Sequence, residues 1–184
     1  MALSPKVGRD GHIARCGARS RDRFWGTAVP LFLSEHENKV DRKGRVSVPA
    51  QYRAQLAGQT FPGIVAYRSD YHPCIECCDM ATMQDYVARI NGMYAKDSPE
   101  HDDASEIFTA AHQLPFDGEG RIMLPQKLAE HAGIAEQACF VGRGGTFQIW
   151  SPDRLRGYQE EARERRRRNR TTIPPLIPGP GEKR

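Results

Sequence analysis

The hydrophobic positions of the chain predict a set of short strands and helices that occurs twice. Apolar residues alternate with other residues at 46–48 and again at 122–124, which indicates strands with one buried face. Short apolar runs predict further strands at 64–67, 74–78, 138–141 and 147–150. Helical patterns occupy 50–56 and 126–132, and longer helices are predicted for 80–93 and from Pro152 onward. The elements therefore predict an α+β fold that is mostly β with flanking helices.

The two sets of elements follow an internal repeat. Residues 41–49 read DRKGRVSVP and residues 117–125 read DGEGRIMLP. Pro49 and Pro125 both suit the first position of a following helix. A nine-residue pattern that is followed twice by the same order of elements indicates a duplicated unit. We predict the two units at residues 35–82 and 111–154.

Each unit contains a tight turn that has an aspartate at its start and a glycine at its end. Asp41 and Asp117 can cap backbone amides across the turn. Gly44 and Gly120 can take a positive φ at little cost. The next residues, Arg45 and Arg121, open the following strands. One such turn would be explained as a hairpin with a surface ion pair, whereas two copies in matched positions indicate a structural turn motif made of Asp41, Gly44, Asp117, Gly120 and Arg121.

This pattern resembles the SpoVT–AbrB family of swapped-hairpin DNA-binding domains. With two copies in one chain, in the segments DRKGRVSVPAQYR, YHPCIECC and DGEGRIMLPQKL, the sequence is similar to the MraZ family of bacterial transcriptional regulators over about residues 31–162. The resemblance implies a pseudo-twofold double-split β-barrel built from two interleaved repeats. It also implies a ring of several subunits that binds repeated sites in double-stranded promoter DNA, upstream of the division and cell-wall genes and at its own promoter. No cofactor, metal or small-molecule substrate is expected.

The distribution of charge bears on which turn would contact DNA. The formal net charge is +4, but residues 25–162 carry 13 Lys and Arg against 19 acids, so a polyanion must bind to a local patch. Residues 39–53 have a net charge of +4 and the matching residues 115–129 a net charge of 0. We therefore predict DNA contacts from the first repeat, by Arg45, Lys43, Arg42, Arg53 and Lys39.

Within this set the residues have different expected functions. Arg45 occupies the position of the family's motif arginine, and arginine can bind the edge of guanine with two hydrogen bonds. Arg42 and Lys43, at the tip of the turn, are expected to hold phosphates. The second turn departs from this pattern because it carries Gly118 and Glu119 there. The alternative interpretation is a solvated hairpin with no ligand.

Both ends of the chain are basic or rich in proline. The last helix is expected to end in an Arg-rich segment, 155–170, that holds Arg163, Arg165, Arg166, Arg167, Arg168 and Arg170. These arginines are candidates for auxiliary, non-specific DNA contacts, or for a solubilising end that complements the helix dipole. Residues 1–30 and 171–184 are predicted to be a disordered Arg-rich leader and a Pro-rich tail.

Other classes of function have weaker support in the sequence. A thiol or metal enzyme could use the segment from Cys74 to Cys78, but a zinc site needs four ligands and no second pair is present. An antitoxin is the other alternative, since that function occurs in the broader superfamily. The longest nearly apolar run, Phe24 to Leu33, is shorter than the ~20 residues of a membrane-spanning helix. We therefore expect no enzyme and no membrane protein, but a cytoplasmic, nucleoid-associated one.

Overall fold

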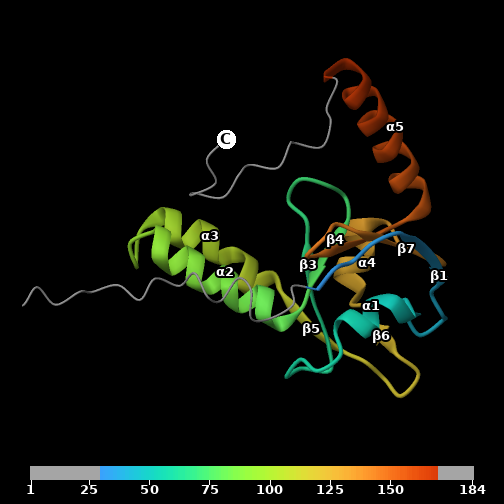
Figure 1. Cartoon of the computed structure of the whole chain (residues 1–184), viewed down its shortest axis with the longest axis horizontal. Helices are drawn as coiled ribbons and strands as arrows, with labels where there is room; N and C mark the ends of the chain where they lie inside the picture. The colour runs from blue at the N-terminus through green and yellow to red at the C-terminus, as the bar shows by residue number, and fades with distance from the viewer. Residues whose placement is uncertain (1–29, 170–184) are drawn as a thin grey trace, which may run out of the picture.

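The structure, a computed structural model, describes residues 30–169 (Figure 1). The first repeat contributes β1 (Glu35–Lys39), β2 (Arg45–Ser47), α1 (Ala50–Gln55), β3 (Gly63–Arg68), β4 (Ile75–Cys78) and α2 (Met80–Met93). After α3 (Pro99–Ala110), the second contributes β5 (His112–Pro115), β6 (Arg121–Met123), α4 (Gln126–Ala132), β7 (Gln137–Gly142), β8 (Phe147–Trp150) and α5 (Pro152–Asn169). The predicted leader (apart from Pro30), the Pro-rich tail and Arg170 lie outside the described residues.

The strands of the two repeats are interleaved. One sheet has the order β1-β7-β8-β4-β3-β5, and a second sheet pairs β2 with β6. All the pairings are antiparallel. Exchanging β1 with β5, β2 with β6, β3 with β7 and β4 with β8 leaves both orders unchanged, so the strand order is symmetric in the two repeats. The mixed α+β class is thus confirmed. Among the described residues the pairing gives two separate sheets, and no closed barrel is detected.

The core lies between the two sheets and draws on both repeats. Phe32 and Tyr52 of the first repeat pack against Phe147 of the second, with ring centroids 4.9 and 5.0 Å apart. Val46 of β2 and Ile122 of β6 are almost fully buried at paired positions. Because each repeat buries its apolar residues against the other, neither would form this core alone.

Local sequence signals account for most helix ends. The Asp79 carboxylate accepts a hydrogen bond from the backbone N–H of Thr82 at 2.7 Å, which confirms the predicted start of α2. Gly133 ends α4 in the left-handed conformation, with φ of 65°. Pro49 and Pro125 occupy the N-cap positions, one residue before the helical position that we expected. Helix α1 ends at Gln55, one residue before the end that the sequence pattern predicts.

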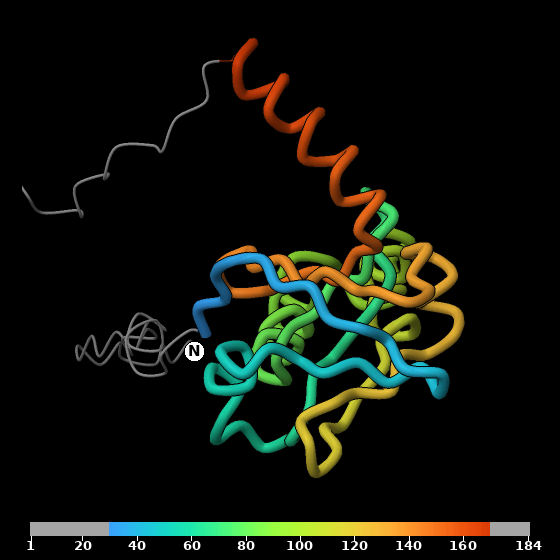
Figure 2. The backbone as a smooth tube through the Cα atoms, turned by 90° about the vertical axis from the view of Figure 1, so that its right-hand side faces the viewer, coloured from blue at the N-terminus to red at the C-terminus, as the bar shows by residue number. Residues whose placement is uncertain are grey.

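No bounds were predicted for helix α3, which forms a hairpin with α2 on one side of the sheet (Figure 1). The signal for it was present, because Ser98 precedes Pro99 as Ser151 precedes Pro152. The Ser98 hydroxyl accepts a hydrogen bond from the backbone N–H of His101 at 3.1 Å. Helix α5 projects away from the body of the molecule (Figure 2). Within residues 30–169, every helix is too short or too polar to span a bilayer.

Candidate nucleic-acid interface

The first turn is organised by the carboxylate of Asp41. One carboxylate oxygen accepts hydrogen bonds from the backbone N–H groups of Lys43 and Arg45, both at 2.9 Å. The other accepts from Nε of Arg45 at 2.7 Å and lies 2.6 Å from its Nη2. Gly44 has a φ of 78°, as the tight turn requires. The backbone hydrogen bond from Arg45, and then the one from its side chain, lower the pKa of Asp41 to about 2.

The second turn has nearly the same geometry. The carboxylate of Asp117 accepts hydrogen bonds from the backbone N–H groups of Glu119 and Arg121 at 2.9 Å. It also accepts from Nε of Arg121 at 2.8 Å. These hydrogen bonds, with the backbone one from Arg121 largest, lower the pKa of Asp117. Gly120 has a φ of 73°. The repeated motif therefore folds into the same capped turn in both repeats.

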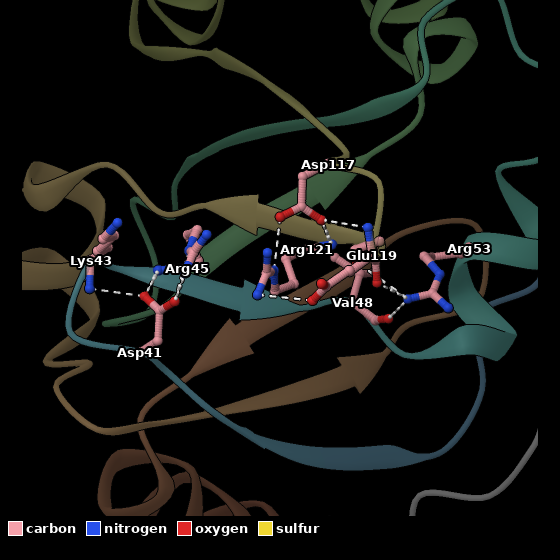
Figure 3. Close-up of polar contacts among 9 residues, drawn as sticks. Asp41, Lys43, Arg45, Val48, Arg53, Asp117, Glu119 and Arg121 are labelled. Atoms are coloured by element: carbon pink, nitrogen blue, oxygen red, sulfur yellow. Dashed lines mark hydrogen bonds and ion pairs between the residues drawn. The ribbon is translucent and has the colours of Figure 1, made fainter.

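The two turns differ in the charge that they present. Nη1 of Arg121 lies 3.0 Å from a carboxylate oxygen of Glu119, so two carboxylates hold this guanidinium (Figure 3). The hydrogen bond to Asp117 is the largest cause of the raised pKa of Arg121. In the first turn Lys43 occupies the position of Glu119, and Arg42 precedes it; both are exposed. The same backbone thus carries uncompensated positive charge in one copy and compensated charge in the other.

The ribbon formed by β2 and β6 fixes the turns at its two ends (Figure 3). The backbone N–H of Val48 donates to the carbonyl of Gly120 at 3.1 Å, and that of Leu124 donates to Gly44 at 2.9 Å. Each turn is therefore held by the strand end of the other repeat. A residue at one tip keeps its distance and orientation relative to the other tip.

Arg53 lies at a different place from the rest of the predicted DNA-binding set. Its Nη1 donates to the carbonyl oxygens of Val48 at 3.1 Å and Gly120 at 3.3 Å, next to the second turn. The pseudo-equivalent position in the second repeat is Ala129, which has no such group. The sequence count for residues 39–53 therefore assigned Arg53 to the first turn, whereas its guanidinium lies at the second. Its function at DNA stays a prediction.

The difference in charge between the two turns persists when Arg53 is counted with the second turn. The first turn has Lys39, Arg42, Lys43 and Arg45 against Asp41, which gives a net charge of +3. The second has Arg121 and the neighbouring Arg53 against Asp117 and Glu119, which gives 0. The structure thus brings four of the five predicted residues together at one end of the ribbon.

The second basic cluster lies at the far end of α5. The start of this helix is anchored by buried Leu155 and by Tyr158, whose hydroxyl accepts a hydrogen bond from Arg143 at 2.8 Å. The arginines from 163 to 168 are exposed. Nη1 of Arg165 lies 3.5 Å from Glu161. In Figure 1 this end of α5 lies far from β6, the strand that joins the two turns, so the cluster is separate from the turns.

The cysteines of the rival enzyme interpretation belong to the core. Cys74, Cys77 and Cys78 are buried. Burial is the largest cause that raises the pKa values of Cys74 and Cys78 to about 12, and it also raises that of fully buried Cys77. A thiol with a raised pKa is a poor nucleophile and a poor metal ligand. Residues 30–169 contain no group of three or more His, Cys, Asp and Glu side chains placed to hold a metal ion.

Comparisons with known proteins agree with the duplicated motif. A family model described as "MraZ protein, putative antitoxin-like" matches twice, at residues 31–103 and 107–173. The chain is 46% identical over 147 residues to the transcriptional regulator MraZ of Rickettsia felis, covering 78% of this chain and 96% of that protein. The corresponding protein of Rickettsia rickettsii gives the same values. That of Rickettsia bellii is 44% identical over 148 residues, with the same shares covered.

Proposed function

The chain belongs to the MraZ family of transcriptional regulators, which are not enzymes, and we propose that it binds double-stranded promoter DNA through its first turn, residues 41–45. The observation that carries this proposal is the charge difference between two turns of the same shape. Phosphates are attracted to a tip with Arg42 and Lys43 and repelled by one with Glu119. The first turn is therefore the element that contacts DNA, and the second turn has a structural function only.

Arg45 is the candidate for reading a base. Its contacts with Asp41 use Nε and one side of Nη2. An arginine has five N–H donors, so Nη1 and the remaining donor of Nη2 can bind the O6 and N7 atoms of guanine. Asp41 holds the guanidinium in a fixed orientation, which reduces the entropy lost on binding. Lys39, Arg42 and Lys43 would contact the phosphates on either side.

Several subunits would be needed for tight binding. A patch that neutralises about three phosphates gives a slope of log K against log salt near −2.7, and a modest affinity on its own. A ring that repeats the patch along repeated DNA sites would increase the affinity through effective concentration. We therefore include a ring of several subunits, with the two sheets of each subunit closed into a barrel, in the proposal. Such a regulator would act in the cytoplasm at the nucleoid, upstream of the division and cell-wall genes and at its own promoter.

The arginines of α5 would serve as auxiliary contacts. Arg163, Arg165, Arg166, Arg167 and Arg168 are exposed along the last turns of the helix, and Arg170 follows them in the sequence. They would attract the phosphate backbone without regard to sequence. Their removal would lower the affinity for all DNA alike and flatten the salt dependence.

An antitoxin function is the second candidate, because the description of the matching family model includes that term. Two fused repeats in one chain weigh against it, since one hairpin unit with a partner-binding tail would be enough. A small toxin that purifies with the chain, and whose activity the chain blocks, would favour this function over promoter binding.

The proposal is tested by a gel shift with DNA from immediately upstream of the chain's own gene, in parallel with a scrambled duplex of the same length and composition. We expect retardation of the promoter fragment at protein concentrations that leave the scrambled duplex free. Equal binding to both duplexes at several salt concentrations would contradict sequence-specific recognition.

A further inference from the structure

A groove of about 950 Å³ lies between the α2–α3 hairpin and the loop from β3 to β4. Tyr71 on the loop and Met93 on α2 line it, and they are 90% and 71% exposed. Ile90 and Ile107 add apolar surface from the two helices. Exposed apolar side chains around a groove are typical of a surface that another element covers.

The groove is acidic as well as apolar. Its lining includes five acids and two arginines, so its net charge is −3: Asp70, Glu76, Glu100, Asp103 and Glu106 against Arg68 and Arg89. Arg68 is held by Glu106 at 2.7 Å. Glu100 and Asp103 of α3 form no ion pair with any residue of the described range 30–169. An occupant with apolar stems and positive ends would match both properties of this surface.

The end of α5 has that chemistry. Arg163, Arg166 and Arg167 share one face of the helix, because positions three and four residues apart are neighbours on a helix surface. Arg165 points to another side, toward Glu161 and the ring of Tyr158. Arginine can also stack on the aromatic rings of the groove, such as Tyr71.

We propose that this groove receives the Arg163, Arg166 and Arg167 face of α5 from a second copy of the chain. The helix of the same chain extends away from the molecular body (Figures 1 and 2). Within the described residues, no hydrogen bond or ion pair joins α5 beyond Gln159 to another element. Because the groove and the helix are different surfaces, the contact can repeat head-to-tail, and it closes into a ring when the rotation allows it. The inference rests on the assembly in the proposed function and names its interface. In the assembled protein it assigns Arg163, Arg166 and Arg167 to that interface and leaves Arg165 and Arg168 for the auxiliary DNA contacts.

Charge reversal on each surface tests the contact. One variant carries Arg163→Glu and Arg167→Glu, and the other carries Glu100→Lys and Asp103→Lys. Like charges across an interface are strongly disfavoured, so each variant alone should require at least about tenfold more protein to assemble in sedimentation velocity. An equimolar mixture of the two variants should recover assembly, because every interface between unlike variants pairs opposite charges. The chain with all four substitutions should also assemble.

Two controls separate the possible outcomes. The variant Lys127→Glu, at an exposed site outside both surfaces, changes the net charge in the same direction as the arginine variant and should assemble normally. Circular dichroism checks that α3 and α5 stay folded. Unchanged assembly of both reversal variants, or no recovery on mixing, would overturn the proposed contact even if the full chain forms a ring.

A third outcome concerns the arginines alone. If Arg163→Glu and Arg167→Glu weaken binding to scrambled DNA while assembly is unchanged, these arginines contact nucleic acid and not the groove. A monomeric unmodified chain would overturn both the contact and the proposed ring. Promoter binding by that monomer would still support the function of the first turn.

Discussion

Arg53 of the first repeat is bonded to the backbone of Gly120 in the second, with its Nη1 3.3 Å from the Gly120 carbonyl oxygen. The fit is close: a Cβ atom on Gly120 would clash with the same nitrogen. Gly44, the equivalent residue in the first turn, has no atom closer than 3.6 Å to such a Cβ. The side chain of Arg53 thus holds the second turn, whereas the first has no matching clamp.

The first prediction follows from this contact. Arg53→Ala should reduce the free energy of unfolding by about 1–2 kcal/mol, because hydrogen bonds from a charged donor to two carbonyls are lost. The measurement is urea denaturation at neutral pH. Gln51→Ala, at an exposed neighbouring position of the same helix, is the control and should have little effect. Equal stability of Arg53→Ala and the unmodified chain would refute the clamp.

The second prediction concerns the dependence of stability on pH. The pKa of Asp41 lies at about 2 in the folded chain, below its ordinary value of 3.8. Because the folded state favours the ionised form, this carboxylate stabilises the fold above about pH 4, and the contribution disappears as the pH falls toward 2. The pKa of Asp117 is lowered by the same kind of contacts. Asp41→Asn and Asp117→Asn should therefore lower the melting temperature at pH 7 by similar amounts.

Melting curves from pH 7 to pH 2.5 check this prediction. The difference in melting temperature between each variant and the unmodified chain should shrink through the range from pH 4 to pH 2.5. Asp85→Asn, on an exposed part of α2, serves as the matched control. A difference that stays constant down to pH 2.5 would show that the ionised carboxylates do not stabilise the turns.

The third prediction converts the second turn into a copy of the first. Glu119→Lys removes the ion pair with Arg121 and places a cation where the first turn has Lys43. Non-specific DNA affinity should rise, and the slope of log K against log salt should become steeper by about one unit. The reciprocal change, Lys43→Glu, should weaken binding and flatten the slope. Fluorescence anisotropy at three salt concentrations measures both, and an unaltered slope in either variant would be the contrary result.

The fourth prediction concerns the cysteines. Cys74, Cys77, Cys78 and Cys139 are buried, and burial raises the pKa of Cys139 to about 11. In the folded chain these four thiols should react with a thiol reagent at pH 8 only as fast as the protein opens, and all should react at once in denaturant. Cys16, which the structure does not describe, is replaced by Ser in this assay. One rapidly reacting thiol in the folded state would revive the enzyme interpretation.

The sequence predicted local elements well because their signals are local. The strand at 147–150 and the helices at 80–93 and 126–132 were predicted with the bounds that the structure has. The strands β1 and β5 were not predicted separately, because each is completed by pairing with a distant strand of the other repeat. The position of Arg53 could not be predicted from charge counting, since its side chain reaches a turn 67 residues away in the chain.

For the candidate site, too, the sequence predicted the local features and not those that depend on contacts between side chains. Asp41, Asp117 and the glycines that end their turns predict the capping of both turns. The turn motif could therefore be identified without a structure. The ion pair between Arg121 and Glu119 depends on side-chain geometry across the turn and was only suggested by the charge count. The groove between α2 and α3 could not be anticipated, because the bounds of α3 and its packing against α2 were not predicted.

The most direct test of the account compares Arg45→Ala with Arg121→Ala in binding to promoter and scrambled DNA, with oligomeric size measured in parallel. Loss of a base contact costs about 1–3 kcal/mol per subunit, and several subunits bound together multiply that loss. We predict that Arg45→Ala abolishes the preference for promoter DNA in a normally assembled protein. Arg121→Ala should keep the preference and affect stability or assembly. Equal loss of the preference in two well-assembled variants would show that both turns read DNA and would contradict the charge asymmetry on which the account rests.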